Sequence, residues 1–259
     1  MKIGVAATAP LGADVLERLA QRHEVAWLLT RPDAPQGRGR KLGPPATKLI
    51  ADELGIPVHQ PEKPELPGEV DRVVVCAYGL YIPPRLLERS LWLNVHPSLL
   101  PRWRGAAPVE RAILAGDAQT GVTIHQTVEA LDAGPVAAKE AFDVGELDAG
   151  QVYARSAEIA ARLLNEVIES PRFESQPEDG AIYAEKITAA DRELNLDDPL
   201  DAWRRVRALS PHIGARGELH GRKMTIWKAR LEDGRFVPEV VQPEGRSQMS
   251  YDEFVRGLR

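Results

Sequence analysis

The chain has 259 residues, of which 43% are hydrophobic and 27% charged, a balance that is typical of a soluble protein that buries a core and that argues against disorder as the default. Its length allows one large domain or a main domain with a small second one. The formal net charge of −5 is unevenly distributed, because residues 190–259 carry 13 Lys and Arg against 12 Asp and Glu, whereas residues 1–189 carry 20 against 26. This basic shift gives slight support to a polyanionic partner and fits an ordinary solvated surface equally well.

The N-terminal residues, MKIGVAATAP, contain no basic leader followed by a long apolar stretch. No segment of the sequence approaches the roughly 18 consecutive apolar residues that span a membrane. We therefore expect a cytoplasmic protein with no membrane partner. The single cysteine, Cys76, excludes an internal disulfide and a cysteine-based metal site, and its apolar surroundings predict a packing role.

The first half alternates short apolar runs with amphipathic stretches, which is typical of a parallel sheet flanked by helices. The pattern predicts strands over residues 2–7, 24–30, 72–78, 91–97 and 120–129. It predicts helices over residues 13–23, 46–55, 107–116 and 149–170.

The pattern changes after about residue 181. A Pro- and acid-bearing segment, residues 171–180, precedes short strands over 215–221, 223–231 and 234–241, with one helix at 199–209. We expect an α/β domain over residues 1–170, a linker over 171–182 and a small β-rich domain over 183–259. No Gly-x-Gly-x-x-Gly follows the first strand and no Walker sequence occurs, which disfavours a nicotinamide, flavin or ATP cofactor.

Two polar residues stand at the end of the predicted strand 91–97. Asn94 and His96 are two residues apart and face the same side of an extended strand, and ligands bind beyond the carboxyl ends of such strands. An amide donor beside an imidazole suits acyl transfer, since the pair can bind an oxyanion and move a proton. Asp132 follows the next strand, and Gly134 allows the tight turn that brings its carboxylate to this edge.

Residues 94–117, NVHPSLLPRWRGAAPVERAILAGD, resemble the signature of the folate-dependent formyltransferases. Asn94, His96 and Asp132 match that family's catalytic trio in type, order and spacing. The continuation RWRGAAP with ERAILAGD is most similar to the methionyl-tRNA formyltransferases within the family. The resemblance implies a Rossmann-like catalytic domain, a small C-terminal domain resembling a reduced OB-like barrel, and formyl transfer from 10-formyltetrahydrofolate to the amino group of initiator methionyl-tRNA.

The resemblance also implies which residues bind the two substrates. Residues 30–49 resemble a basic loop that contacts tRNA in the family, with Arg38, Arg40 and Lys41 as the matching cations. The folate donor would border two segments of the chain: Tyr78, Gly79, Leu80, Tyr81 and Ile82, and Ser98, Leu99, Leu100 and Pro101. No metal is implied, because the remaining histidines lack ligand spacing, and we expect a monomer.

The sequence departs from the family between Leu231 and Val241, where part of the β-barrel is missing. This loss would either weaken non-specific tRNA affinity or shift tRNA binding to the basic loop and to Arg204, Arg205 and Arg207. Two alternatives stay open: a formyltransferase acting on an amino-sugar nucleotide, which would not need the basic loop, and a non-catalytic RNA-binding protein on the same scaffold.

Overall fold

The computed structural model describes residues 1–36 and 41–258. The chain divides into two compact units. The first comprises Met1–Arg104, Gly121–Ala141 and Ala154–Ile182, and the second comprises Gly105–Thr120, Phe142–Tyr153 and Tyr183–Arg259. In the described part of the chain, no helix is both long and apolar enough to cross a bilayer.

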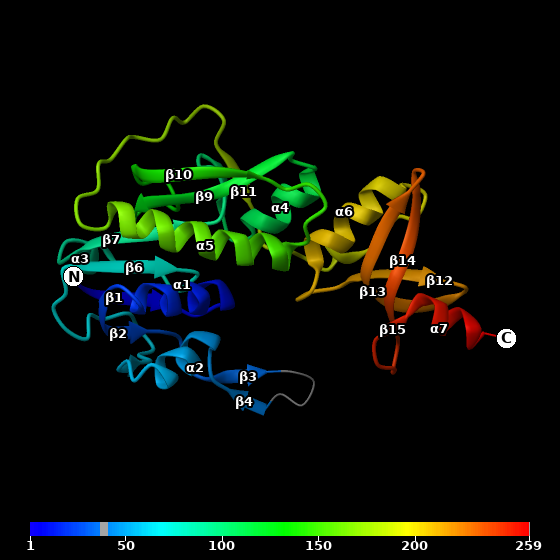
Figure 1. Cartoon of the computed structure of the whole chain (residues 1–259), viewed down its shortest axis with the longest axis horizontal. Coiled ribbons are helices and arrows are strands. Elements are labelled where there is room, and N and C mark those ends of the chain that lie inside the picture. The colour runs from blue at the N-terminus through cyan, green and yellow to red at the C-terminus, as the bar shows by residue number, and fades with distance from the viewer. Residues whose placement is uncertain (37–40, 259) are drawn as a thin grey trace. The chain divides into compact units, whose positions relative to one another are not determined.

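A seven-stranded sheet with the strand order β10-β9-β7-β6-β1-β2-β5 forms the framework of the first unit (Figure 1). Its strands are β1 (Lys2–Ala7), β2 (Glu24–Leu29), β5 (Val58–His59), β6 (Arg72–Cys76), β7 (Leu91–His96), β9 (Gln119–Gln126) and β10 (Val136–Asp143). The strands from β5 to β7 in this order are parallel, and β9 is antiparallel to β7. The expected α/β fold with a mainly parallel sheet is confirmed.

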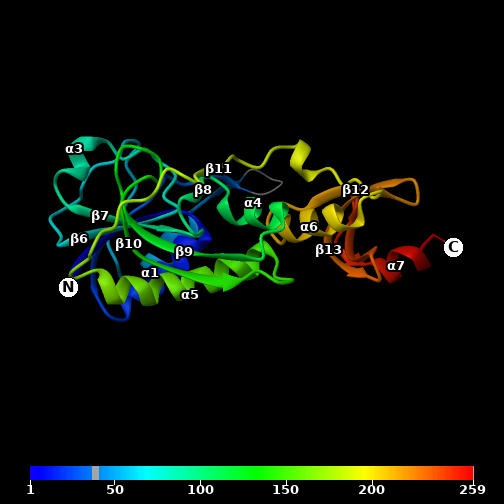
Figure 2. The same ribbon diagram turned by 90° about the horizontal axis from the view of Figure 1, so that it is seen from above.

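Helices cover both faces of this sheet. Helices α1 (Pro10–Ala20) and α5 (Ala149–Val167) lie on one face and α3 (Pro84–Leu87) on the other (Figure 2). Helix α2 (Ala46–Glu53) packs against α1. Helix α1 starts earlier than the sequence pattern predicts, because Pro10 occupies its first turn, where a missing N–H costs nothing. Its apolar side chains recur every three or four residues and are buried.

The central strands are buried on both faces, as expected for strands covered by helices. Side chains from β1, β2, β6 and β7 form a hydrophobic cluster with Tyr78, Ile82 and Leu86. Cys76 is fully buried, and burial raises the pKa of its thiol, so the predicted packing role is confirmed.

The second unit contains a four-stranded antiparallel sheet of β12 (Ala215–Leu219), β13 (Arg222–Glu232), β14 (Arg235–Pro243) and β15 (Met249–Ser250). Its helices are α4 (Pro108–Ala115), α6 (Pro199–Leu209), α7 (Tyr251–Arg256) and the 3₁₀ turn Ala190–Arg192. Gly116 ends α4 in the left-handed conformation, φ 72°, as the sequence predicts. The β-rich character expected of the C-terminal region is confirmed.

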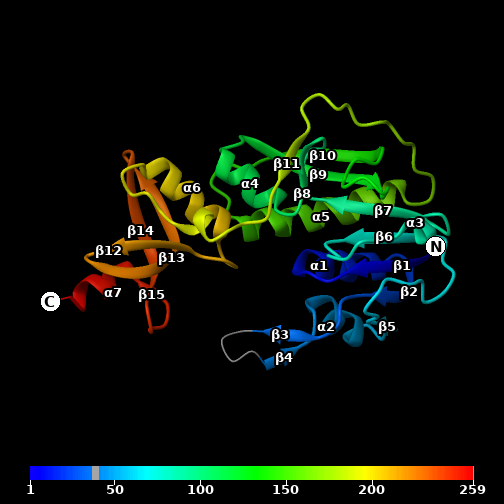
Figure 3. The ribbon, with the colours of Figure 1, turned by 180° about the vertical axis from the view of Figure 1, so that it is seen from behind.

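Two short ribbons complete the structure. Strand β3 (Ala34–Gln36) pairs with β4 (Lys41–Gly43), which Figure 3 shows from behind, and β8 (Arg102–Gly105) pairs with β11 (Ile182–Ala184). These ribbons, together with α3, β5, β15 and α7, are too short to produce a periodic sequence pattern, so they were not predicted.

Candidate active site

Strand β7 places the first two predicted catalytic residues. It lies between β6, with which it is parallel, and β9, with which it is antiparallel. The register pairs Asn94 with His125 and His96 with Thr123. Asn94 and His96 therefore share one face of the sheet beside β9, at the carboxyl end of the parallel strands where ligands bind in this class of fold.

Asp132 completes the predicted trio from the turn after β9. Its Oδ1 accepts a hydrogen bond from Asn94 Nδ2 at 3.2 Å, and its Oδ2 lies 3.6 Å from His96 Nδ1. Its backbone has φ 49°, a strained conformation for a residue other than glycine. No other residue fits in place of Gly134, because a Cβ would collide with the Gln126 carbonyl oxygen. The structure thus brings together the three residues that the sequence singled out.

His96 is 4% exposed, and desolvation lowers the pKa of its imidazole. The nearby Asp132 carboxylate opposes this shift. His96 Nε2 lies 2.8 Å from the carbonyl oxygen of Trp103, which only accepts hydrogen bonds, so Nε2 carries the proton. In the neutral ring, Nδ1 is then a base that faces Asp132. The backbone carbonyl of Trp103 therefore fixes the tautomer of His96.

His125 is a site residue that sequence reasoning missed. Its Nδ1 lies 3.0 Å from the Gln126 carbonyl oxygen, and its Nε2 lies 3.0 Å from Asn94 Nδ2. Nδ1 therefore carries the proton, and Nε2 accepts a hydrogen bond from Asn94. Because Asp132 Oδ1 accepts a hydrogen bond from the other amide hydrogen, both Nδ2 hydrogens of Asn94 have partners. The sequence feature that could have identified His125 is its position on one face of an alternating strand.

The first segment predicted to border a folate, residues 78–82, follows β6. The Tyr78 side chain is buried in the hydrophobic cluster, which raises the pKa of its hydroxyl to about 12, and Ile82 is buried there too. Gly79 has φ 78°, and Tyr81 is 62% exposed. Only the turn from Gly79 to Tyr81 is therefore accessible to a ligand.

The second predicted segment, Ser98–Pro101, is tied to β9. Thr123 Oγ1 donates to the Ser98 carbonyl at 2.7 Å and accepts from the Leu100 N–H at 3.2 Å. Ser98 Oγ donates to the carbonyl of Arg102 at 2.7 Å. The side chain of Leu100 is buried, while Leu99 is half-buried. These bonds fix the loop that follows the strand carrying Asn94 and His96.

Of the three cations proposed for tRNA binding, the structure describes only Lys41. Lys41 is exposed on β4, beside Leu42, which is 72% exposed. Arg38 and Arg40 lie outside the described residues.

Arg205 and Arg207 of α6 have partners within the second unit. Arg207 is 7% exposed, stacks on the Trp203 ring at 3.8 Å and donates to the Gly145 carbonyl. Arg205 pairs with Asp201 at 2.5 Å. Arg207 therefore stabilises the fold and is not accessible to a phosphate.

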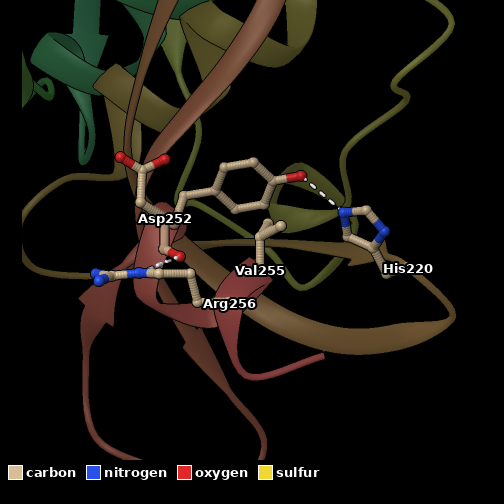
Figure 4. A pocket seen from close by; sticks show the side chains of 5 residues that line it. His220, Asp252, Val255 and Arg256 are labelled. Atoms are coloured by element: carbon tan, nitrogen blue, oxygen red, sulfur yellow. Dashed lines mark hydrogen bonds between the residues drawn. The ribbon is translucent and has the colours of Figure 1, made fainter. Parts of the chain in front are cut away.

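Two further observations concern ligands. The described ranges contain no cluster of three or more His, Cys, Asp or Glu side chains fit for a metal ion. A shallow hollow in the second unit is lined by His220, Tyr251, Asp252, Val255 and Arg256 (Figure 4). It contains none of the predicted site residues, and His220 Nε2 lies 2.9 Å from the Tyr251 hydroxyl.

Residues 1–168 match the family described as formyl transferase, and the chain belongs to this family. Its relatives include methionyl-tRNA formyltransferases. The one from Cereibacter sphaeroides is 36% identical over 291 aligned positions, which cover 100% of this chain and 96% of the relative. The one from Xanthomonas axonopodis pv. citri is 40% identical and covers 87% of this chain and 80% of the relative.

Solved structures share the fold. Methionyl-tRNA formyltransferase from Clostridium thermocellum aligns with a TM-score of 0.66 and 14% identity, over 94% of this chain and 98% of that one. An N-formyltransferase from Helicobacter canadensis, in complex with folinic acid and dTDP-3-aminofucose, aligns with a TM-score of 0.69 and 17% identity, over 94% and 99%. Fold likeness at this identity does not define the substrate.

Proposed function

We propose that this protein transfers the formyl group of 10-formyltetrahydrofolate to the amino group of methionine on initiator tRNA, in the cytoplasm. The observation that carries the proposal is the meeting of Asn94, His96 and Asp132 at the carboxyl end of β7. Membership of the formyl transferase family supports the reaction class. The names of the relatives support the acceptor, and the folinic acid in one structural neighbour supports a reduced folate donor.

The reaction forms a bond between the amine nitrogen and the formyl carbon and breaks the bond from that carbon to folate N10. Negative charge develops on the formyl oxygen, where a fixed N–H donor is most effective. Asn94 supplies this donor when one of its two amide hydrogens leaves its present partner, His125 or Asp132.

The amine must also lose a proton, which ends on the departing N10. His96 is suited to move it, because burial keeps the ring neutral and Nδ1 is unprotonated. The Asp132 carboxylate, 3.6 Å from Nδ1, stabilises the imidazolium that forms. Asp132 thus acts on His96 as a charge, while the Trp103 carbonyl fixes the ring orientation.

We also propose where the two substrates bind. We assign the pterin of the donor to the space beside the Gly79–Tyr81 turn and the Ser98–Pro101 loop, because both segments follow strands at the edge that bears Asn94. We assign the acceptor end of tRNA to Arg38, Arg40 and Lys41, since cations that neutralise phosphates position a nucleic acid without reading its sequence.

One assay separates this function from its rivals. The purified chain is incubated with 10-formyltetrahydrofolate and, in separate reactions, with charged initiator tRNA, an amino-sugar nucleotide and glycinamide ribonucleotide. Formylation of the charged tRNA is expected. Formylation of the sugar alone would establish the alternative acceptor, and tRNA binding without any formyl product would indicate a non-catalytic RNA-binding protein. In the active case, near wild-type turnover of His96→Ala would contradict the proposed mechanism.

A further inference from the structure

The position of Asp132 depends on side chains that take no part in the proposed reaction. Its positive φ of 49° and its position in a turn mean that its own backbone does not favour the observed conformation. Something in the first unit must hold this turn.

Gln176 lies in the segment between α5 and β11, where it reaches the turn. Its Nε2 donates to the Asp132 carbonyl at 2.8 Å and to the Gly134 carbonyl at 2.7 Å. Both amide hydrogens of Gln176 are thus used to bracket the residue that carries the carboxylate. Nearby, Glu174 and Val136 exchange two backbone hydrogen bonds, which fixes this segment alongside β10.

Arg104 fixes the other end of the Gln176 side chain. Its Nε and Nη2 donate to Gln176 Oε1 at 3.1 and 3.0 Å, and its side chain is only 2% exposed. Such a forked pair of hydrogen bonds restricts the orientation of the amide. Glu178, 83% exposed, lies 3.4 Å from Arg104 and balances its charge.

Arg104 directly follows Trp103, whose carbonyl accepts the hydrogen bond from His96 Nε2. The Arg104–Gln176 pair therefore connects the two segments that act on opposite nitrogens of His96. We propose that Gln176, oriented by Arg104, is a positioning residue that holds the Asp132 carboxylate at His96. This role rests on the proposed function only in that Asp132 and His96 serve formyl transfer.

The groups that face the His96 ring are the Asp132 carboxylate, the His125 ring and the Trp103 carbonyl. Asp132 favours the protonated ring, so loss of its fixed position lowers the pKa of His96. Gln176→Leu removes all four hydrogen bonds of the amide. Gln176→Glu keeps an acceptor for Arg104 but cannot donate to the two carbonyls. Glu178→Gln, which alters only the exposed partner of Arg104, is the matched control.

The pKa of His96 is measured by NMR titration in each folded variant, together with kcat and KM. Gln176→Leu should lower the pKa of His96. Both Gln176 variants should reduce kcat by about ten- to a hundredfold, as expected for a misplaced group, with KM for tRNA nearly unchanged. Glu178→Gln should match the wild type. In an Asp132→Asn background, Gln176→Leu should not change the pKa further.

A folded Gln176→Glu variant with wild-type kcat and an unchanged His96 pKa would overturn the proposal, as would a further pKa shift in the Asp132→Asn background. If Gln176→Leu does not fold, Gln176→Glu alone decides. If the wild type does not formylate tRNA, the titration still tests the positioning role, because it requires no substrate.

Discussion

Asn94 and His125 face each other across the antiparallel pair of β7 and β9, with Nδ2 of the amide 3.0 Å from Nε2 of the ring. The Gln126 carbonyl fixes the proton of His125 on Nδ1, so Nε2 has only a lone pair to offer. This lone pair orients the Asn94 amide with its nitrogen toward His125 and Asp132. The orientation of the proposed oxyanion donor therefore depends on a residue from the neighbouring strand.

Replacing His125 should reduce turnover through Asn94. We expect Asn94→Ala to lower kcat by about 10²–10³, the usual effect of losing an oxyanion donor. His125→Ala should lower kcat less, because the donor survives but loses its orientation. In the double variant the effects should not add, and kcat should equal that of Asn94→Ala. The measurement is steady-state formylation of charged tRNA.

The control for the Asn94 and His125 variants is His23→Ala. His23 Nε2 lies 2.9 Å from Asn165 Oδ1, another His–Asn contact of the first unit that involves none of the site residues. This variant should retain wild-type kcat. Additive losses in the Asn94 and His125 double variant would mean that His125 acts independently of the amide.

The pH dependence of the reaction should reflect two opposing effects on His96. Burial lowers its pKa and the Asp132 carboxylate raises it. The neutral ring is the active base, so kcat/KM should fall as the pH drops through the pKa of His96, below its usual value of about 6.5. Asp132→Asn should lower kcat and move this acid limb to lower pH. A shift of the limb to higher pH would contradict the assigned electrostatic role.

The sequence was sufficient for those features that depend on local pattern. Buried strands such as β6 and amphipathic helices such as α1 are visible as periodicities. The two-residue spacing of Asn94 and His96 placed both on one side of a strand, and the turn at Gly134 placed Asp132 near them. Each of these inferences needs only neighbouring residues and the rule that parallel strands end at one edge.

The partners of these residues were not predictable in the same way. His125 meets Asn94 because of the register of β7 against β9, which no local pattern specifies. Trp103 acts through a backbone carbonyl, so its side-chain identity carries no signal. Gln176 lies 44 residues from Asp132 in a segment that reads only as a linker. Contacts of this kind are set by the tertiary structure.

The second unit should lose stability in acid through one ion pair. Arg111 donates to Asp191 at 2.8 Å, which holds the pKa of that carboxyl at about 2. Because the folded-state pKa is lowered, the stabilisation is present above about pH 4 and is lost as the pH falls through 2. Allowing for solvent screening, its contribution is about 1 kcal/mol. Urea unfolding at several pH values should show this loss in the wild type but not in Asp191→Asn.

The comparison for Asp191→Asn is Asp179→Asn, a change at an exposed carboxyl. This control should retain the acid-dependent loss of the wild type. Equal pH dependence of the wild type and Asp191→Asn would show that the ion pair does not contribute to the acid sensitivity.

The last prediction concerns the surface that holds tRNA. Each neutralised phosphate releases counterions, so the slope of log affinity against log salt concentration measures the number of contacts, at about 0.7–0.9 per phosphate. Replacing Arg38, Arg40 and Lys41 by Ala should reduce the slope by about 2–3 if each contacts one phosphate. Folate affinity should not change, because these cations are assigned to tRNA alone.

The matched variant removes three exposed cations of β13, Arg222, Lys223 and Lys228. It changes the net charge by the same amount, so a general effect of charge would alter both slopes equally. If the basic segment holds tRNA, only the first variant flattens the slope. If only the β13 variant flattens the slope, the antiparallel sheet of the second unit is the tRNA surface, and the assignment of Arg38, Arg40 and Lys41 is wrong. Equal flattening would show that long-range attraction, rather than contact at either surface, dominates the affinity.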